Sequence, residues 1–385
     1  MEIITVTRGN ELLGYVAIDS TIAGHCCGGL RMLPDVTETE MAGLARAMTL
    51  KYGFLSLPQG GAKAGVRGDP EAPPEVRRER LLAFGREIAP LLRSRRYVPH
   101  PDMGTNNTDI RSLLEAVGVK VKHRELRVKA SGYYTALTVM AGVKQGARHL
   151  GLDLSRASVA IEGFGKVGSA LGGLLDAAQV RVIAVSTSRG ALYNPHGLDM
   201  KRLCAETGSD FVERYRDADH LDRAALLELP VDILCPCARH DSIHAGNAAR
   251  IAAKLISPGA NNPITTEAER MLEARSVLCL PDLVTNSGGV LGGTMEFAMQ
   301  PRDVIERFVD QHIGARIARL LGQSESPRAL AERDARARFA AMQQAAEHPT
   351  LKGRLMEVGL ECHRRGWAPG GLIRKLSLPY FEQRM

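Results

Sequence analysis

A glycine-rich turn that directly follows a short apolar segment is the feature that most constrains the fold of this chain. Ser158 to Glu162 predicts a buried strand, and Gly163-Phe164-Gly165-Lys166-Val167-Gly168 leads from it into a helix that runs to about Ala178. In such a turn the first glycine permits the tight bend, the second lets a pyrophosphate approach the backbone, and the third allows close helix–strand packing, with the phosphates on amides of the helix N-terminus. The strand–turn–helix context predicts a dinucleotide site. The alternative is a glycine-rich turn in an unrelated α/β sheet.

Predicted strands and helices alternate around this turn. Thr135 to His149 carries small and apolar residues at helical spacing, and the C-terminal part of the chain predicts helices rich in Ala and Arg. Further strands are expected at Val180–Val185, Val231–Cys235, Leu255–Ser257 and Val277–Leu280. Because strands that alternate with helices form a parallel, doubly wound sheet, we expect a Rossmann-type domain.

The end of the second strand of this sheet determines which cofactor we expect. A carboxylate there would hydrogen-bond the ribose 2′-hydroxyl and repel a 2′-phosphate. This chain has Ser186-Thr187-Ser188-Arg189 instead, and hydroxyls beside an arginine suit a phosphate. The sequence therefore favours NADP(H) over NAD(H), the alternative being that Arg189 is an exposed turn residue. The unusually basic segment from Val119 to Val128, with Lys129 directly after it, is interpreted as a solvated loop, or else as a contact with cofactor phosphates.

A lysine among glycines marks a second segment with potential chemistry, Leu57-Pro58-Gln59-Gly60-Gly61-Ala62-Lys63-Ala64-Gly65. Glycine lets a ligand approach the backbone closely. A lysine deprived of solvent has a lowered pKa and becomes usable as a base. The alternative is a surface turn with a solvated lysine.

An amphipathic helix is expected just before this lysine, from about 38 to 53. Thr37 and Glu40 form a capping-box pattern, and apolar residues recur behind them at helical spacing. Lys51 falls in the last turn, where its charge suits the helix dipole irrespective of any other role. Another helix is expected from Glu79 to Leu92, and Tyr97 to Thr105 predicts an extended piece that ends in a turn.

Length and composition limit the class of protein. A chain of 385 residues is long for one core, so two domains are expected. No stretch approaches the roughly 18 to 20 apolar residues of a membrane span, and Met1 to Ile4 has no basic n-region, so we expect a cytoplasmic protein with no membrane partner. The seven cysteines lack a CxxC arrangement and suit free thiols, with no metal site. A net charge of +7 with one Trp and no nucleic-acid motif favours anionic small molecules over nucleic acid as ligands.

Five short motifs follow one another in the order and spacing of one enzyme family. They are Gly28-Gly29-Leu30-Arg31-Met32, Lys51, Lys63 with its glycines, Pro101-Asp102-Met103-Gly104-Thr105 and Asn286-Ser287-Gly288-Gly289-Val290. Together they resemble the glutamate/leucine/phenylalanine/valine dehydrogenase superfamily, from about residue 25 to 300. The resemblance implies a two-domain α/β fold. An α/β domain for substrate binding and oligomerisation would comprise residues 1–132 with C-terminal helices from 331–385, and a Rossmann-type domain residues 133–330. It also implies a homo-oligomer and a cleft that closes on substrate.

The resemblance also implies roles for residues at matching positions. Lys63 corresponds to the catalytic lysine, Asp102 to the catalytic aspartate and Lys51 to the lysine that binds the substrate α-carboxylate. Asn262 is similar to the asparagine that assists that carboxylate, and Thr135 to a threonine near the nicotinamide carboxamide. Besides the glycine-rich turn, the implied cofactor contacts are Cys237, Ala238, Asn261 and Asn286; the implied substrate pocket includes Gly28, Gly29, Met48, Val290 and Gly293. The implied reaction converts an L-amino acid to its 2-oxo acid and ammonia, with a neutral lysine as base.

Two positions depart from the glutamate-specific pattern. Those members carry a lysine for the side-chain carboxylate where this chain has Cys27, and Gly293 stands three residues past Val290 in place of a β-branched wall. A neutral residue cannot pair a second carboxylate, and the missing side chain enlarges the pocket. An uncharged, apolar or aromatic L-amino acid is therefore expected, as in leucine/phenylalanine-type members. The alternatives are a non-catalytic relative that binds nucleotide or amino acid, and a dehydrogenase of an unusual biosynthetic amino acid.

Overall fold

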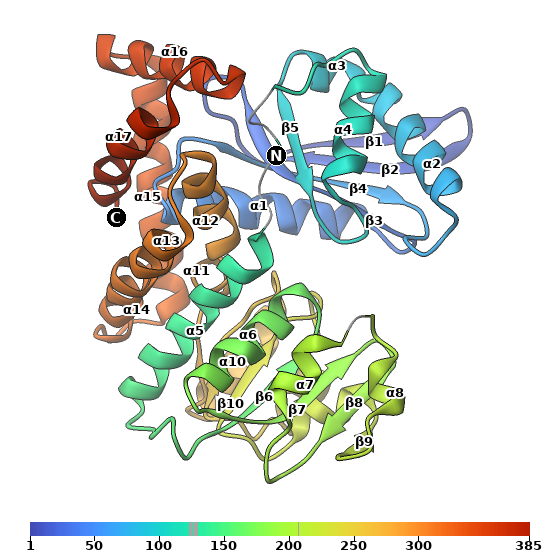
Figure 1. Ribbon diagram of the computed structural model, residues 1–385, viewed down its shortest axis with the longest axis vertical. Coiled ribbons are helices and arrows are strands. Elements are labelled where there is room, and N and C mark those ends of the chain that lie inside the picture. The colour runs from blue at the N-terminus through green and yellow to red at the C-terminus, as the bar shows by residue number, and fades with distance from the viewer. Residues whose placement is uncertain (123–125, 127–129, 207) are drawn as a thin grey trace. The chain divides into compact units, whose positions relative to one another are not determined.

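Two compact units make up this computed structural model, which describes residues 1–122, 126, 130–206 and 208–385 (Figure 1). Unit 1 comprises Met1–Val128, Phe297–Met299 and Glu332–Met385, and unit 2 comprises Lys129–Glu296 and Gln300–Ala331. Each unit has a β-sheet with helices packed on it, so the expected two-domain α/β fold is confirmed.

The sheet of unit 1 has the strand order β1-β2-β4-β3-β5 among the described residues. Strand β2 is antiparallel to both of its neighbours, β1 and β4, whereas β3 is parallel to both of its neighbours, β4 and β5. The strands are β1 (Glu2–Arg8), β2 (Glu11–Ile18), β3 (Cys26–Leu33), β4 (Gly60–Arg67) and β5 (Tyr97–Pro101). The segment around Lys63 is thus a central strand, which rules out the surface-turn alternative.

Helices cover both faces of this sheet (Figure 1). Helix α1 (Glu38–Phe54) lies on one face. A Cβ at Gly61 would come within 2.3 Å of the Thr49 nitrogen, and a Cβ at Gly65 within 2.7 Å of the Met41 sulfur. Those two glycines therefore let α1 pack closely on β4. The expected helix and its N-cap are confirmed, since Thr37 accepts a hydrogen bond from the Glu40 amide at 3.2 Å. Helices α2 (Pro74–Glu87) and α4 (Asn107–Ala116) cover the opposite face, where the larger apolar core of unit 1 lies.

The helix expected from Glu79 to Leu92 is two helices. Helix α2 begins five residues earlier than expected, because Pro74 suits the first helical position, and the chain breaks at Ile88 before α3 (Ala89–Arg93). Pro90 has no amide hydrogen and cannot continue the α2 ladder. The remaining helices of unit 1 are α15 (Pro327–Glu347) from Glu332 onward, α16 (Leu351–Arg365) and α17 (Gly370–Glu382). Helix α15 packs against the end of α1, where Arg338 donates to the Phe54 carbonyl at 3.2 Å.

The sheet of unit 2 has the order β12-β11-β10-β6-β7-β8-β9 among the described residues. The first five strands in this order are parallel, which confirms the doubly wound sheet, and β8 and β9 add an antiparallel extension that the sequence did not predict. Strand β7 lies on one side of β6 in the sheet, and β10, which comes later in the chain, lies on the other side of β6. The loops that follow β6 and β10 therefore meet at the topological switch point, where such sheets bind ligands. The strands are β6 (Ser158–Glu162), β7 (Arg181–Thr187), β8 (Gly190–Tyr193), β9 (Asp219–Leu221), β10 (Ile233–Pro236), β11 (Leu255–Ile256) and β12 (Leu278–Cys279).

Helices pack on both faces of this second sheet, and α5 and α12 approach each other closely at Tyr134. A Cβ at Gly288 would lie 1.8 Å from the Tyr134 carbonyl oxygen, and one at Gly292 would lie 2.2 Å from the Tyr134 ring. None of the described helices is both long enough and apolar enough to span a membrane. The helices are α5 (Ser131–His149), α6 (Lys166–Ala177), α7 (Met200–Ala205), α8 (Phe211–Arg214), η1 (Arg223–Glu228), α9 (Ala245–Ala248), α10 (Thr266–Ala274), α11 (Asp282–Thr285), α12 (Gly288–Phe297), α13 (Arg302–Phe308), η2 (Val309–Ile313) and α14 (Gly314–Leu321).

Candidate active site

Lys63 belongs to a buried cluster of charges in unit 1. Its ammonium pairs with the Asp102 carboxylate, and Arg31 donates from Nε to Asp102 Oδ2 at 3.0 Å. Arg31 also donates from Nη1 to Glu40 Oε1 at 2.5 Å. Arg31 belongs to the Gly28–Met32 motif, but no role was predicted for it. A charged residue inside an otherwise apolar strand indicates a buried partner of opposite charge, because burial of an unpaired charge is costly.

Glycine at position 29 allows this cluster to form. Cys27 is in register with Gly61 and Arg31 with Gly65, so alternate residues of β3 share the face of the sheet that carries Lys63. A Cβ on Gly29 would lie 3.0 Å from Lys63 Nζ and 2.9 Å from Asp102 Cβ. At Gly28, on the other face, a Cβ would lie 1.7 Å from the Ala62 carbonyl oxygen. Both glycines predicted in the substrate pocket therefore have a steric role in bringing strands and side chains together.

The two members of the Lys63–Asp102 pair have strongly perturbed acidities. Burial lowers the pKa of Lys63, the negative charge of Asp102 raises it and the positive charge of Arg31 lowers it. The resulting pKa lies below that of an ordinary lysine. Burial raises the pKa of Asp102, but Lys63 and Arg31 outweigh burial and hold that pKa well below its usual range. The Lys63 side chain is 4% exposed and that of Asp102 is 20% exposed. The cluster therefore holds an ionised carboxylate that solvent reaches beside a lysine that loses its proton more readily than usual.

A rigid turn holds Asp102 in place after β5. The Thr105 hydroxyl donates to the Leu30 carbonyl at 2.7 Å and accepts from the Asp102 amide at 3.0 Å. Gly104 adopts a φ of +73°, and a Cβ there would lie 2.1 Å from the Met32 carbonyl oxygen. The backbone around Asp102 is thus tied to β3, which fixes the carboxylate relative to Lys63.

Helix α1 brings two further predicted residues to the face that carries Lys63. Lys51 lies in the last turn of α1 and is buried, whereas Met48 is half-buried. A buried lysine is not explained by the helix dipole alone, because desolvating a charge is costly. Lys51 is therefore not a solvated C-terminal lysine.

Cys27 has polar neighbours that the sequence did not single out. The side chains of His100 on β5 and Tyr52 on α1 lie close to its thiol. Burial raises the pKa of this thiol, but the His100 and Tyr52 interactions bring it below its ordinary value. His100 is in register with Gly29, and therefore lies beside the Lys63–Asp102 pair.

The glycine-rich turn of unit 2 has the geometry of a phosphate cradle. Gly163 has a φ of +87°, and a Cβ there would lie 2.7 Å from Ala238 Cα; a Cβ on Gly168 would lie 2.0 Å from the Gly163 carbonyl oxygen. Gly165 has no atom within 4 Å of its Cβ position, so the space in front of α6 is open. These residues fit a dinucleotide whose pyrophosphate lies over Gly165.

The other residues of the turn differ in what they offer a ligand. Lys166 is exposed at the first position of α6, whereas the Phe164 ring is buried and lies edge to face with Phe211, so Phe164 contributes to packing. Val167 and Cys237 both lie against Gly259. A Cβ at Gly259 would lie 3.0 Å from Val167 Cγ1 and 2.5 Å from Cys237 Sγ. The loops after β6, β10 and β11 therefore meet at the switch point.

Glu162, immediately before the turn, is a buried acid that sequence reasoning passed over. Ser242 donates to its Oε2 at 3.0 Å, and burial raises its pKa to about 7. The composition of the strand gave a signal, because a carboxylate ends an otherwise apolar segment.

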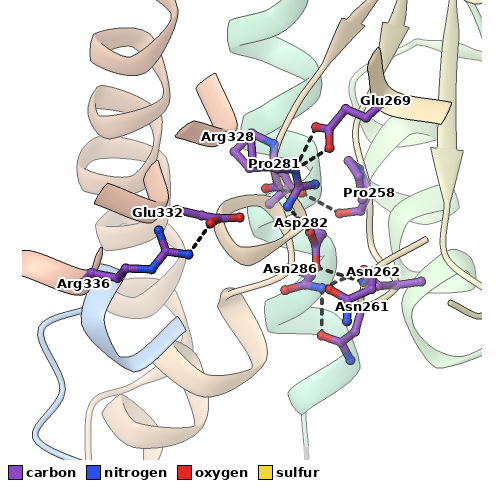
Figure 2. Close-up of polar contacts among 12 residues, drawn as sticks. Pro258, Asn261, Asn262, Glu269, Pro281, Asp282, Asn286, Arg328, Glu332 and Arg336 are labelled. Carbon is purple, nitrogen blue, oxygen red and sulfur yellow. Dashed lines mark hydrogen bonds and ion pairs between the residues drawn. The ribbon is translucent and has the colours of Figure 1, made fainter. Parts of the chain in front are cut away.

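Asparagine side chains and amides are fixed on the loops beyond β11 and β12 (Figure 2). Asn262 has a φ of +47° and its amide donates to Asp282 Oδ2 at 3.0 Å. Asn286 donates from Nδ2 to the Ala260 carbonyl at 2.7 Å and to Asn261 Oδ1 at 3.0 Å. Among the described residues, no hydrogen-bond donor reaches the buried Asn286 Oδ1. A buried acceptor of this kind is available to a donor on a bound ligand.

Three of the predicted ligand residues lie on the paired helices α5 and α12. The Thr135 hydroxyl donates to the Ser131 carbonyl at 2.9 Å and lies 2.7 Å from the Cβ position of Gly289. Val290 is half-buried and Gly293 is buried on α12.

Only part of the basic segment at Val119–Lys129 can be placed. His123, Arg124, Arg127 and Lys129 lie outside the described residues. Lys122 donates to the Glu361 carboxylate at 2.6 and 2.7 Å, an ion pair within unit 1. Its charge is therefore balanced by α16.

A Rossmann-type sheet with an open glycine cradle defines the class of dinucleotide-dependent enzymes. The comparison with known families is more specific. The Glutamate/Leucine/Phenylalanine/Valine dehydrogenase model matches residues 127–345, and the Glu/Leu/Phe/Val dehydrogenase, dimerisation domain model matches residues 4–118. The chain belongs to this family and is an amino acid dehydrogenase.

Individual relatives agree with this assignment. The glutamate dehydrogenase of Thermotoga maritima is 38% identical over an alignment of 298 residues that covers 72% of this chain and 70% of that protein. The catabolic NAD-specific glutamate dehydrogenase of Bacillus subtilis is 32% identical over an alignment of 295 residues that covers 72% of this chain and 68% of that protein. The hetero-hexameric glutamate dehydrogenase of Thermus thermophilus, in its Leu-bound form, has a TM-score of 0.72 at 24% identity and covers 91% of this chain and 89% of its own. That structure shows similarity of fold. The closer kinship to leucine/phenylalanine-type members is not supported by these relatives.

The predicted preference for NADP(H) is wrong. The Bacillus subtilis relative, like others of similar identity, is named as NAD-specific. The structure supplies the physical reason, because the hydroxyls expected to hold a 2′-phosphate are engaged in the fold. Ser186 is buried and accepts from the Gly163 amide at 3.0 Å, while Thr187 donates to the Ser209 carbonyl at 2.9 Å. Arg189 is an exposed turn residue, the alternative that the sequence left open.

Proposed function

We propose that this protein catalyses the reversible, NAD-dependent oxidative deamination of an uncharged L-amino acid to its 2-oxo acid and ammonia. The observation that carries the proposal is the buried Lys63, paired with Asp102 and depressed in pKa. A protein that only binds a nucleotide or an amino acid has no need of such a group, whereas imine hydrolysis requires a base in a fixed position.

In this proposal each residue has a defined part in the reaction. Lys51 and Asn262 bind the substrate α-carboxylate and so orient Cα. A bound NAD would supply the hydride acceptor. Lys63 in its neutral form takes the proton from the water that attacks the imine carbon. Asp102 carries protons between that position and the substrate nitrogen, which leaves as ammonia. The pair is held rigidly by Arg31 and by the Thr105 turn, which suits a reaction that tolerates little misplacement.

The dinucleotide is assigned to unit 2 and the substrate chiefly to unit 1. We propose that the pyrophosphate lies over Gly165, with Gly163 and Gly168 shaping the turn and Lys166 at the start of α6. Other proposed cofactor contacts are Thr135, Cys237, Ala238, Asn261 and Asn286, and the orphaned Oδ1 of Asn286 supports its place among them. The N-terminal region matches a dimerisation domain, which supports assembly into a homo-oligomer.

The nature of Cys27 supports an uncharged side chain on the substrate. Glutamate requires a cation for its second carboxylate, and Cys27, with its lowered pKa, contributes either no charge or a negative one. A thiolate would repel the carboxylate, and His100 beside it is engaged with that thiol. Met48, Val290 and Gly293 are the other residues proposed to contact the substrate side chain. The glutamate dehydrogenases among the relatives make glutamate the competing substrate.

A panel of 2-oxo acids tests the proposal. The purified protein is assayed for NADH oxidation with ammonia and each acid in turn, including 2-oxoglutarate and the acids of leucine, phenylalanine and tryptophan. We expect turnover with apolar acids at a kcat/KM above that for 2-oxoglutarate. Preference for 2-oxoglutarate would contradict the substrate assignment, and absence of turnover with every acid would contradict the reaction.

A further inference from the structure

Arg328 joins two buried carboxylates in unit 2 at a place that the proposed chemistry does not touch (Figure 2). It is the second residue of α15, and its Nε donates to Glu269 Oε1 and Oε2 at 2.8 and 2.6 Å. Its Nη1 donates to Asp282 Oδ1 at 3.0 Å. The side chain of Glu269 is 8% exposed and that of Asp282 is 2% exposed. A guanidinium suits this place because its planar donors reach two carboxylates at once.

The second oxygen of Asp282 connects this cluster to the substrate-binding loop. Asp282 Oδ2 accepts from the Asn262 amide, and Asn262 has a left-handed backbone with a φ of +47°. A non-glycine residue persists in that conformation only where its surroundings hold it. Asp282 also begins α11, and its carbonyl accepts from the Asn286 amide at 2.9 Å. Asp282 therefore supports the backbone of both asparagines, that of Asn262 through its carboxylate and that of Asn286 through its backbone carbonyl.

Removing Arg328 would leave Asp282 without its cationic partner in a desolvated place. A buried carboxylate that has lost its cationic partner is no longer held in one orientation. An Asp282 side chain that rotates no longer presents Oδ2 to the Asn262 amide. The orientation of Asn262 therefore depends on a residue far away in sequence.

We propose that Arg328 is a positioning residue, which acts through Asp282 to hold Asn262 in the orientation that binds the substrate carboxylate. This inference rests on the proposed function, which gives Asn262 that role. It assigns no contact between Arg328 and substrate or cofactor.

A double-mutant cycle tests the proposal. Arg328→Met and Asn262→Ala are made singly and together, and KM and kcat for the best amino acid of the panel are measured at saturating NAD. We expect Arg328→Met to raise the amino acid KM roughly 10- to 100-fold, the effect of one charge-assisted hydrogen bond, with a smaller change in kcat. The double variant should resemble Asn262→Ala, because Arg328 has nothing left to position. Arg328→Lys, which keeps the charge and loses the fork, should fall between wild type and Arg328→Met and serves if Arg328→Met does not fold.

Arg336→Met is the matched control. Arg336 lies on the same helix and donates to Glu332, four residues earlier, at 2.6 Å, but its side chain is 62% exposed (Figure 2). We expect the amino acid KM of Arg336→Met to equal that of wild type. Additive effects of Arg328→Met and Asn262→Ala, or an unchanged KM in both Arg328 variants, would overturn the positioning role while leaving the proposed function intact. A wild-type protein that turns over no amino acid would overturn both.

Discussion

Lys63 and Asp102 form an ion pair that reaches across an entire strand. Lys63 is on β4 and Asp102 directly follows β5, while β3 lies between these strands in the sheet. The two side chains meet over Gly29, where any side chain would displace them. Arg31, two residues further along β3, completes the cluster by donating to the same carboxylate oxygen. One short strand thus supplies both the space for the pair and its second cation.

The pair predicts how activity depends on pH. Neutral Lys63 is the base for deamination, so kcat/KM should rise with pH through a pKa below that of an ordinary lysine. Asp102 raises the pKa of Lys63, so Asp102→Asn should shift the rising limb to lower pH. The same change should reduce kcat/KM roughly 100-fold or more, because a proton carrier is lost. Profiles of kcat/KM from pH 6 to 10.5 measure both effects; a limb that moves to higher pH in Asp102→Asn would contradict the assigned roles.

Two glycines of the dinucleotide turn should respond differently to alanine. A Cβ at Gly165 meets open space, whereas one at Gly168 would lie 2.0 Å from the Gly163 carbonyl. Gly165→Ala should therefore keep the wild-type melting temperature and weaken NADH binding, because the methyl group occupies the place of the pyrophosphate. Gly168→Ala should lower the melting temperature as well. Calorimetric titration with NADH and thermal denaturation separate the two; unchanged NADH affinity in Gly165→Ala would place the cofactor elsewhere.

Glu162 should make stability depend on pH. Its pKa is raised from 4.5 to about 7 in the folded protein, so the stability it contributes is fully present below about pH 4.5 and is lost as pH rises through 7. The loss amounts to at most roughly 3 kcal/mol. Between pH 5.5 and 8.5, wild type should therefore lose more free energy of unfolding than Glu162→Gln, because the glutamine side chain at position 162 does not titrate. Urea denaturation of both proteins at the two pH values provides the comparison, and parallel losses would show that Glu162 stays ionised throughout.

A change at Cys27 should redirect substrate choice. Cys27→Lys places a cation where the proposed pocket lacks one, so kcat/KM for 2-oxoglutarate relative to the best apolar acid should increase roughly 10- to 100-fold. Cys27→Ser, which keeps the size and introduces no cation, is the control and should leave the ratio near that of wild type. Equal ratios in all three proteins would mean that the substrate side chain does not lie beside residue 27.

Much of the Rossmann-type unit could be predicted because its determinants are local. Ser158–Glu162, the glycine-rich turn and the following helix are adjacent in sequence, and apolar runs reveal buried parallel strands. The antiparallel β8 and β9 were missed, since short strands with mixed polarity have little pattern. The cofactor preference failed for a related reason. The bonds from Ser186 to Gly163 and from Thr187 to Ser209 join distant residues, so the hydroxyls looked available in sequence.

The charged cluster of unit 1 was only half predictable. Family motifs pointed to Lys63 and Asp102, but glycine-rich β4 has only Val66 as a β-branched residue, the type that is typical of strands. Its glycines reflect contact with α1, a tertiary cause. Arg31, Glu40 and His100 could not be assigned because their partners are set by sheet register. Glu40 illustrates this, since its position suggested a capping residue and its side chain pairs with Arg31.

The most direct test of the central claim compares wild type with Lys63→Ala at equal NADH occupancy. NADH affinity is first measured for both proteins by fluorescence titration, and initial rates of NADH oxidation are then recorded with the best 2-oxo acid and ammonia. If Lys63 is the proton-transfer centre, Lys63→Ala binds NADH as wild type does and its kcat falls by roughly 100- to 10,000-fold. A variant that binds NADH normally and keeps a kcat within a few-fold of wild type would contradict the account.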